Sequence, residues 1–244
     1  MTTYTILKVN PRKFLALTGL TPQEFELLLA PFSQGCERLY HPDRTLAGRP
    51  RQRFWGAGRH GSLYAPEQKL LFILVYLKTY PVQVLLGEIF NLSQPQVNHW
   101  IHRLLPVLRS ALDELGALPE RDPTQFARSQ PRSGPEPRLI IDGAERRRQR
   151  PKNPEKQRLH YRGKKKAHSD KNVIVAEARS QRVGFLSATR PGKTHDKQIA
   201  DEEGICYPPG TVLYKDTGFQ GYEPAVRETH QAKKKAAPRG THAQ

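Results

Sequence analysis

Residues 139–143 read Leu-Ile-Ile-Asp-Gly, an apolar run that ends in an acid, and residues 212–218 repeat this design as Val-Leu-Tyr-Lys-Asp-Thr-Gly. A carboxylate at the end of a buried strand is costly unless it binds a metal ion or a partner charge. If the two strands are neighbours, Asp142 and Asp216 emerge at the same end of one sheet, and a divalent cation relieves their repulsion. Oxygen ligands of this kind suit Mg²⁺ or Mn²⁺. The pattern therefore predicts a metal site for phosphodiester chemistry.

Each aspartate also has a plainer interpretation. Asp-Gly is a common hairpin turn, and residues 216–218 fit a turn as well. Taken singly, each acid is more often a turn residue than a ligand. Only the shared position after an apolar run favours the metal site.

The composition indicates a polyanionic partner. The 244 residues include 40 Lys and Arg against 23 Asp and Glu, which gives a formal net charge of +17. Such a surplus attracts DNA, RNA or an anionic membrane, and a basic ribosome-type binder is the plainer alternative. The longest apolar run, 70–77, is much shorter than the ~20 residues that span a bilayer. Cys36 and Cys206 fit free thiols in a reducing compartment, so we expect a cytoplasmic, nucleoid-associated protein without membrane contact.

Residues 1–116 have the pattern of a helical DNA-binding domain. Residues 21–24, Thr-Pro-Gln-Glu, form a capping box with proline at the first helical position, and a second helix opens at Pro66. A short helix over 82–90, a turn and a further helix from about residue 94 predict a helix-turn-helix near 66–112.

The last of these helices has two distinct faces. One face carries an apolar stripe that includes Val97 and Ile101, and Pro106 is expected to kink or end the helix. The opposite face is polar, as a recognition helix in the major groove must be. A small helical bundle with an ordinary polar face is the alternative. The candidate DNA-contacting residues on this face are Asn98, His99, His102 and Arg103.

Residues 117–137 are rich in proline and poor in apolar residues, which predicts a linker and a domain boundary. Residues 138–244 then change period. Short β-branched or apolar segments predict strands, with a helix between them, so the fold class is an α domain followed by an α/β or α+β domain. The predicted strands are 139–141, 172–178, 183–188 and 211–214, and the predicted helix is 195–203.

Eleven Lys and Arg residues lie within residues 146–166. Such a run is usually a solvated face or a disordered arm. Beside a metal site it can instead neutralise phosphates and hold DNA against the ions. A zinc site from His160, His168 and His195 is an alternative that lacks zinc-finger spacing.

Several of these segments resemble one known family in their order and wording. Residues 141–145 (Ile-Asp-Gly-Ala-Glu), 150–151 (Arg-Pro), 161–168 (Tyr-Arg-Gly-Lys-Lys-Lys-Ala-His), 192–197 (Gly-Lys-Thr-His-Asp-Lys) and 216–222 (Asp-Thr-Gly-Phe-Gln-Gly-Tyr) carry the resemblance. They are similar to the catalytic domain of DDE transposases from bacterial insertion sequences, of the family-five type. In that family a helix-turn-helix precedes an RNase H-like domain.

The resemblance implies a site and a partner. Asp142 and Asp216 would be catalytic ligands of Mg²⁺ or Mn²⁺, the first on the first strand and the second after the fourth strand. His195 and Asp196 belong to the family pattern without an assigned role. The partners would be double-stranded DNA, both terminal inverted repeats and target DNA, bound by a homo-oligomer. The residues implied to face DNA or support the site are Arg150, Lys164, Lys165, Lys166 and His168.

The chain also departs from the family pattern. The family takes a third carboxylate, a glutamate, from a helix well beyond the second aspartate, and here only Glu223 and Glu228 follow Asp216. We therefore expect an insertion-sequence transposase that is truncated at its C-terminus, with an incomplete RNase H-like mixed sheet and impaired activity. A non-catalytic DNA-binding protein that inhibits transposition is the alternative, and a basic RNA-binding protein is a third reading.

Overall fold

The computed structural model describes residues 3–39, 49–50, 52, 61–129 and 136–232. The chain divides into two compact units, Met1–Leu118 and Pro119–Gln244, which are described separately. No helix among the described residues combines the length and apolar character that crossing a membrane requires.

The first unit is helical. Thr21 and Glu24 form the expected capping box, in which the Thr21 backbone N–H donates to Glu24 Oε2 at 2.7 Å and the Glu24 N–H donates to Thr21 Oγ1 at 3.2 Å. Its described helices are α1 (Tyr4–Lys8), α2 (Pro11–Thr18), α3 (Pro22–Leu39), α4 (Pro66–Thr79), α5 (Gln83–Phe90) and α6 (Gln94–Glu114).

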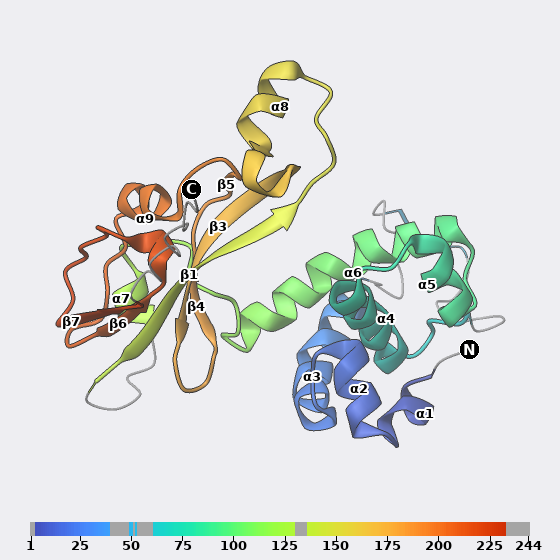
Figure 1. Cartoon of the computed structure of the whole chain (residues 1–244). Helices are drawn as coiled ribbons and strands as arrows, with labels where there is room; N and C mark the ends of the chain where they lie inside the picture. The colour runs from blue at the N-terminus through green and yellow to red at the C-terminus, as the bar shows by residue number, and fades with distance from the viewer. Residues whose placement is uncertain (1–2, 40–48, 51, 53–60, 130–135, 233–244) are drawn as a thin grey trace, which may run out of the picture. The chain divides into compact units, whose positions relative to one another are not determined.

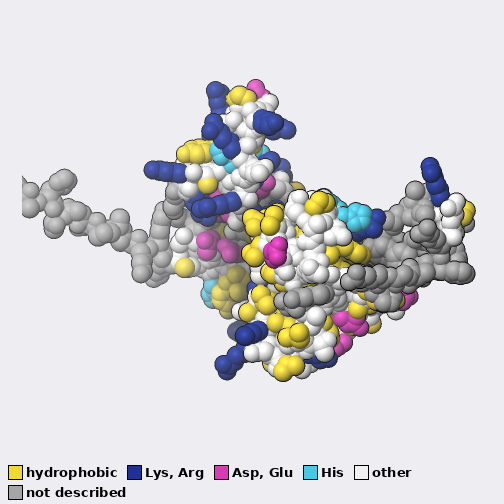
Figure 2. Space-filling model, turned by 90° about the vertical axis from the view of Figure 1, so that its right-hand side faces the viewer, with side chains coloured by type: hydrophobic (Ala, Val, Ile, Leu, Met, Phe, Trp, Pro, Cys, Tyr) yellow, Lys and Arg dark blue, Asp and Glu magenta, His cyan; other side chains and the backbone are white. Residues whose placement is uncertain are grey.

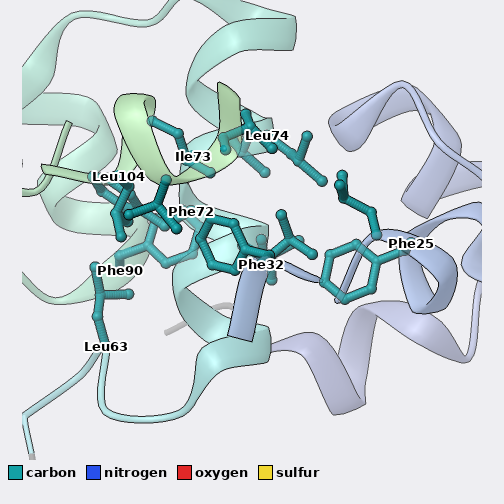
Figure 3. Close-up of a cluster of buried hydrophobic side chains, with 14 of the residues drawn as sticks. Phe25, Phe32, Leu63, Phe72, Ile73, Leu74, Phe90 and Leu104 are labelled. Atoms are coloured by element: carbon teal, nitrogen blue, oxygen red, sulfur yellow. The ribbon is translucent and has the colours of Figure 1, made fainter. Parts of the chain in front are cut away.

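The core of the first unit surrounds α4. Residues 70–75 of this helix are all buried, as its continuous apolar run predicts. Phe25 and Phe32 from α3 and Phe90 from α5 pack with it (Figure 3). Full burial of such side chains supplies much of the stability of the unit, because truncating one to alanine typically costs about 3–5 kcal/mol.

Helices α5 and α6 form the helix-turn-helix segment. Asn91 ends α5 in the left-handed conformation, with φ 54°, and a Cβ at Gly87 would lie 2.4 Å from the Leu92 carbonyl oxygen, so only glycine fits there. Ser93 and Gln96 form a capping box at the start of α6. The helix does not end at Pro106, which was one of the two outcomes we expected there. Its buried stripe continues through Val107, Leu108 and Ala111.

The second unit contains a mixed sheet. Its strands are β1 (Arg138–Arg147), β2 (Tyr161–Arg162), β3 (Ala167–Glu177), β4 (Val183–Leu186), β5 (Arg190–Pro191), β6 (Val212–Lys215) and β7 (Glu228–Gln231). Its helices are α7 (Phe126–Ser129), α8 (Pro154–His160) and α9 (Asp196–Glu203), with short 3₁₀ turns η1 (Gly163–Lys165) and η2 (Thr217–Phe219).

The strand order agrees with an RNase H-like fold. Strand β1 pairs antiparallel with β3 on one side and parallel with β6 on the other, and β7 continues the sheet beside β6 (Figure 1). Among the strands of four or more residues, β6 is the fourth in the chain, as the resemblance implied. The predicted fold class, a helical region followed by a mixed sheet with helices, is confirmed.

Part of the proline-rich segment 117–137 packs onto this sheet. Phe126 in α7 is fully buried beside Phe185. The Glu120 N–H donates to the Gly184 carbonyl at 2.8 Å, and the Leu186 N–H donates to the Glu120 carbonyl at 3.0 Å. This contact was not predictable from the sequence, because one aromatic residue among prolines and charged residues gives no periodic signal.

The two faces of β1 differ. Leu139 and Ile141 point into the core of the second unit, together with Val175 and Leu213. Ile140 points to the other face and is 40% exposed. Because side chains alternate along a strand, Asp142 lies on the same exposed face as Ile140.

Candidate active site

The parallel register of β1 and β6 brings the two predicted aspartates together. Ile140 pairs with Tyr214, and Ile141 pairs with Lys215. Asp142, which lies within β1, and Asp216, which follows the end of β6, are each the next residue. They therefore lie side by side where the β1–β6 pairing ends, on strands about 4.8 Å apart, and we call them the strand-end aspartates in this sense. The predicted proximity of Asp142 and Asp216 therefore follows directly from the pairing of β1 with β6.

Both carboxylates are exposed. Our expectation that burial makes their position costly is therefore wrong. Asp142 Oδ1 accepts a hydrogen bond from the Gly143 N–H at 2.7 Å. Asp216 Oδ1 accepts one from the Gly218 N–H at 2.9 Å and so caps η2. The turn interpretation and the ligand interpretation are thus compatible, because these bonds occupy one oxygen of each carboxylate.

The two aspartates line one cleft of about 650 Å³. Its walls include Ile140 from β1, Tyr214 from β6 and His230 from β7. The rings of Tyr214 and His230 stack with centroids 5.1 Å apart. The cleft is large enough for part of a nucleotide and carries the acids at one end of the strands.

The donor set fits a divalent cation. Neither Asp142 nor Asp216 forms an ion pair with any described residue. Lys215 directly precedes Asp216 in the chain. Its side chain points to the opposite face of the sheet, where Nζ donates to the Tyr222 carbonyl at 2.5 Å and lies 3.7 Å from Glu223. Two carboxylates completed by substrate phosphates are a common Mg²⁺ arrangement. Within the described ranges, no three His, Cys, Asp or Glu side chains are grouped to hold a metal by themselves.

The basic stretch between the aspartates forms a projection, which we define as residues 144–170. Strands β1 and β3 run on together beyond the end of β6, and α8 lies at their far end (Figure 1). No residue of α8 is buried. Lys and Arg side chains cover this part of the surface, at the top of Figure 2.

Glu145 is the centre of the base of the projection. Its side chain is 8% exposed, ion-paired with Arg162 and with Lys165 at 2.7 Å, and it accepts a hydrogen bond from Ser169 at 2.7 Å. Burial alone would raise the pKa of Glu145, but these hydrogen bonds and positive charges outweigh it and lower the pKa to about 2. Lys165, which we predicted to contact DNA, is therefore engaged within the protein.

A second acid holds α8. Asp170 Oδ1 lies 2.9 Å from Arg148 Nη1 and 2.8 Å from His160 Nδ1. This contact occupies His160, one of the three histidines of the zinc alternative. Sequence reasoning missed both Glu145 and Asp170, whose only signal was an acid among many cations.

The predicted DNA-contacting residues of the projection have different environments. Lys166 is exposed, Arg150 Nε donates to Gln157 at 3.1 Å, and the His168 ring packs against Tyr161 with centroids 5.4 Å apart. The side chain of Lys164 lies outside the described part of the structure. Five exposed cations form neither an ion pair nor a side-chain hydrogen bond with a described residue: Arg147, Lys152, Lys156, Arg158 and Lys166.

In the first unit, the candidate face of α6 is accessible. Asn98, His99 and His102 are exposed, and Arg103 is half-buried. Burial and the charge of Arg103 lower the pKa of His99, which favours its neutral form. These side chains can donate to or accept from base edges or phosphates.

Comparison with known families agrees with both regions. Residues 61–114 match the helix-turn-helix of DDE superfamily endonuclease, and residues 141–244 match the DDE superfamily endonuclease family. Neither the curated proteins nor the solved structures provide a match. The chain thus contains a region similar to the helix-turn-helix of DDE superfamily endonucleases and a region similar to the DDE endonuclease domain. The second region includes Asp142 and Asp216.

Proposed function

We propose that this protein is an insertion-sequence transposase that cleaves DNA at terminal inverted repeats and joins the ends to target DNA. The observation that carries the proposal is the register that sets Asp142 beside Asp216 without a cationic partner. The two families matched, and the net charge of +17, agree with a DNA substrate.

In this proposal, Asp142 and Asp216 hold Mg²⁺ or Mn²⁺. The bound ion would supply Lewis acidity at a phosphodiester and lower the pKa of a bound water. The protein's own contribution is to bind and orient the DNA. The exposed residues Asn98, His99 and His102 of α6 would read the terminal repeat, and the unpaired cations of the projection would contact phosphates near the strand-end acids.

The proposal is tested with a duplex that carries the repeat of the element and with Mg²⁺. Substituting Asp142→Asn should reduce cleavage by about a thousandfold or more, because members of a catalytic unit act together. Retention of the duplex on the protein should change little, because Asp142 contributes no cation to DNA binding. Equal loss of cleavage and retention would instead indicate that Asp142 serves folding.

A non-catalytic DNA-binding protein is the second candidate, in which the chain occupies element ends and inhibits transposition. It is favoured by the compactness of the first unit, which carries the exposed polar face of α6 without any contribution from the strand-end acids. It predicts repeat-specific binding, no cleavage by the wild type with either Mg²⁺ or Mn²⁺, and no effect of Asp142→Asn on either measurement.

A further inference from the structure

A partly buried ion pair lies beside the strand-end aspartates and has no part in the site described so far. Lys171 Nζ in β3 lies 3.1 Å from Oδ1 of Asp196, the first residue of α9. The Lys171 side chain is only 4% exposed, and its ammonium group also donates to the Thr194 carbonyl at 2.8 Å. Lys171 thus ties the start of α9 to the central part of the sheet.

Asp196 reaches the backbone next to both aspartates, in β1 and in η2. A Cβ added to Gly143, which follows Asp142, would lie 2.4 Å from Asp196 Oδ1. A Cβ added to Gly218, in the turn after Asp216, would lie 3.2 Å from Asp196 Oδ2 and 3.0 Å from Asp216 Oδ1. The two glycines therefore leave the space that one carboxylate occupies, and that carboxylate lies against both β1 at Gly143 and the η2 turn at Gly218.

Lys171 makes this position of Asp196 stable. Asp196 Oδ1 is buried and accepts no hydrogen bond from the described residues, so the nearby ammonium group is the charge that offsets its burial. Removing one partner of a buried pair leaves an uncompensated charge, and the pair therefore resists displacement. A rigid pair that lies against both β1 and η2 fixes the distance between Asp142 in β1 and Asp216 at the start of η2.

We propose that the Lys171–Asp196 pair is a positioning device, which sets the separation of Asp142 and Asp216 for the divalent cation that they share. The inference rests on the proposed function. In this proposal Asp196 does not bind the ion. It contacts the backbone at Gly143 and Gly218, close to the two ligands, and so holds the ligands in position.

The test measures Mn²⁺ binding to the full chain by titration calorimetry, without DNA. Asp196→Asn keeps the size of the side chain but loses its charge, and Lys171→Met removes the ammonium group. Both should weaken Mn²⁺ binding by about tenfold or more, as substitutions next to ligand residues do. The matched control is Asp201→Asn, at an exposed acid of the same helix that pairs with Lys197, and it should bind Mn²⁺ as the wild type does.

Lys171→Met separates positioning from ligation. If Asp196 were itself a ligand, release from Lys171 would leave Mn²⁺ binding unchanged or tighter, which would overturn the proposal. Unfolding curves recorded without Mn²⁺ identify a merely structural role, in which the unfolding midpoint falls but the folded protein binds Mn²⁺ with wild-type affinity. That result would also overturn the proposal.

A double-mutant cycle tests the contact itself. Gly143→Ala should weaken Mn²⁺ binding in the wild type, because its methyl group collides with Asp196. In an Asp196→Ala background the same substitution should cost less, because the space is then vacant. Additive losses would contradict the contact.

The inference and the proposed function fail in different ways. If Asp142→Asn weakens Mn²⁺ binding but Asp196→Asn and Lys171→Met do not, the positioning role is wrong and the proposed function stands. If Asp142→Asn binds Mn²⁺ as the wild type does, the shared-cation site is wrong, and the positioning role is wrong with it.

Discussion

Two pairs of carboxylates in the second unit have opposite surroundings. Asp142 and Asp216 are exposed where the β1–β6 pairing ends and form no ion pair with a described residue. Glu145 and Asp170, at the base of the projection, are each held by two basic side chains. The partners of the second pair are Arg162 and Lys165 for Glu145, and Arg148 and His160 for Asp170.

Cations are plentiful close to both pairs, because the basic stretch begins four residues after Asp142. Side chains alternate between the two faces of the sheet along β1 and β6. The neighbours of Asp142 and Asp216 on their own face are therefore Ile140 and Tyr214, which form an apolar and aromatic cleft wall without a cation. The difference teaches that an acid inside a basic region indicates a functional site when no cationic side chain of the protein pairs with it. This contrast supports a strand-end pair that binds an ion from outside the chain.

The strongest way to break the contrast is to place a cation in the cleft. Ile140→Lys sets an ammonium group on the same face as Asp142, two residues before it. The lysine should pair with the strand-end acids and compete with Mg²⁺, so cleavage should fall by about a hundredfold. Cleavage rates at increasing Mg²⁺ measure the effect, and excess Mg²⁺ should partly restore activity. Ile140→Gln is the uncharged control, and an equal loss in this control would refute the charge effect.

The contrast is sharpened at Glu145. Glu145→Gln leaves Arg162 and Lys165 without their anion and should lower the free energy of unfolding by about 1–3 kcal/mol. Urea unfolding at neutral pH measures this loss. Glu177→Gln is a matched control at a half-buried β3 acid, which accepts a hydrogen bond from the neighbouring Ser180.

The stability difference at Glu145 should also depend on pH. The folded-state pKa of about 2 lies below the ordinary value of 4.5, so the stabilisation is complete above 4.5 and is lost as the pH falls from 4.5 toward 2. Wild type and Glu145→Gln should therefore converge in stability across this acid range. A constant difference would show that the Glu145 charge does not contribute.

The smallest expected effects concern single unpaired cations of the projection. Lys156→Gln and Arg158→Gln should each weaken DNA binding uniformly across sequences and reduce the slope of log affinity against log salt by about one. Fluorescence anisotropy at several salt concentrations measures this slope. Arg179→Gln, at an exposed cation in the turn between β3 and β4, is the control, and an identical change in its slope would mean that the projection has no special role.

Periodicity and placement predicted most of the fold. The apolar run of α4, the capping box at Thr21 and the strand that precedes Asp216 appeared as local patterns. The strand that was predicted over 139–141 continues past Asp142 to Arg147, because polar residues 143–147 pair with β3. The parallel pairing of β1 with β6 was a conditional expectation, because no local signal specifies which strands become neighbours.

Long-range polar contacts were not predictable from the sequence. The burial of Glu145, the attachment of Phe126 to the second core and the Lys171–Asp196 pair depend on residues distant in the chain. Lys165 shows the consequence, since it belonged to a run of apparently equivalent lysines but pairs with Glu145. The composition identifies such a run of lysines. Only the fold shows which of them form ion pairs within the protein and which remain available to bind DNA.

The most direct test of the central claim is a Mn²⁺-binding cycle on Asp142→Asn, Asp216→Asn and the double variant. If both acids hold one ion, each single substitution should remove nearly as much affinity as the double substitution, because the remaining carboxylate binds poorly alone. Independent, additive losses, or wild-type affinity in either single variant, would contradict a shared cation.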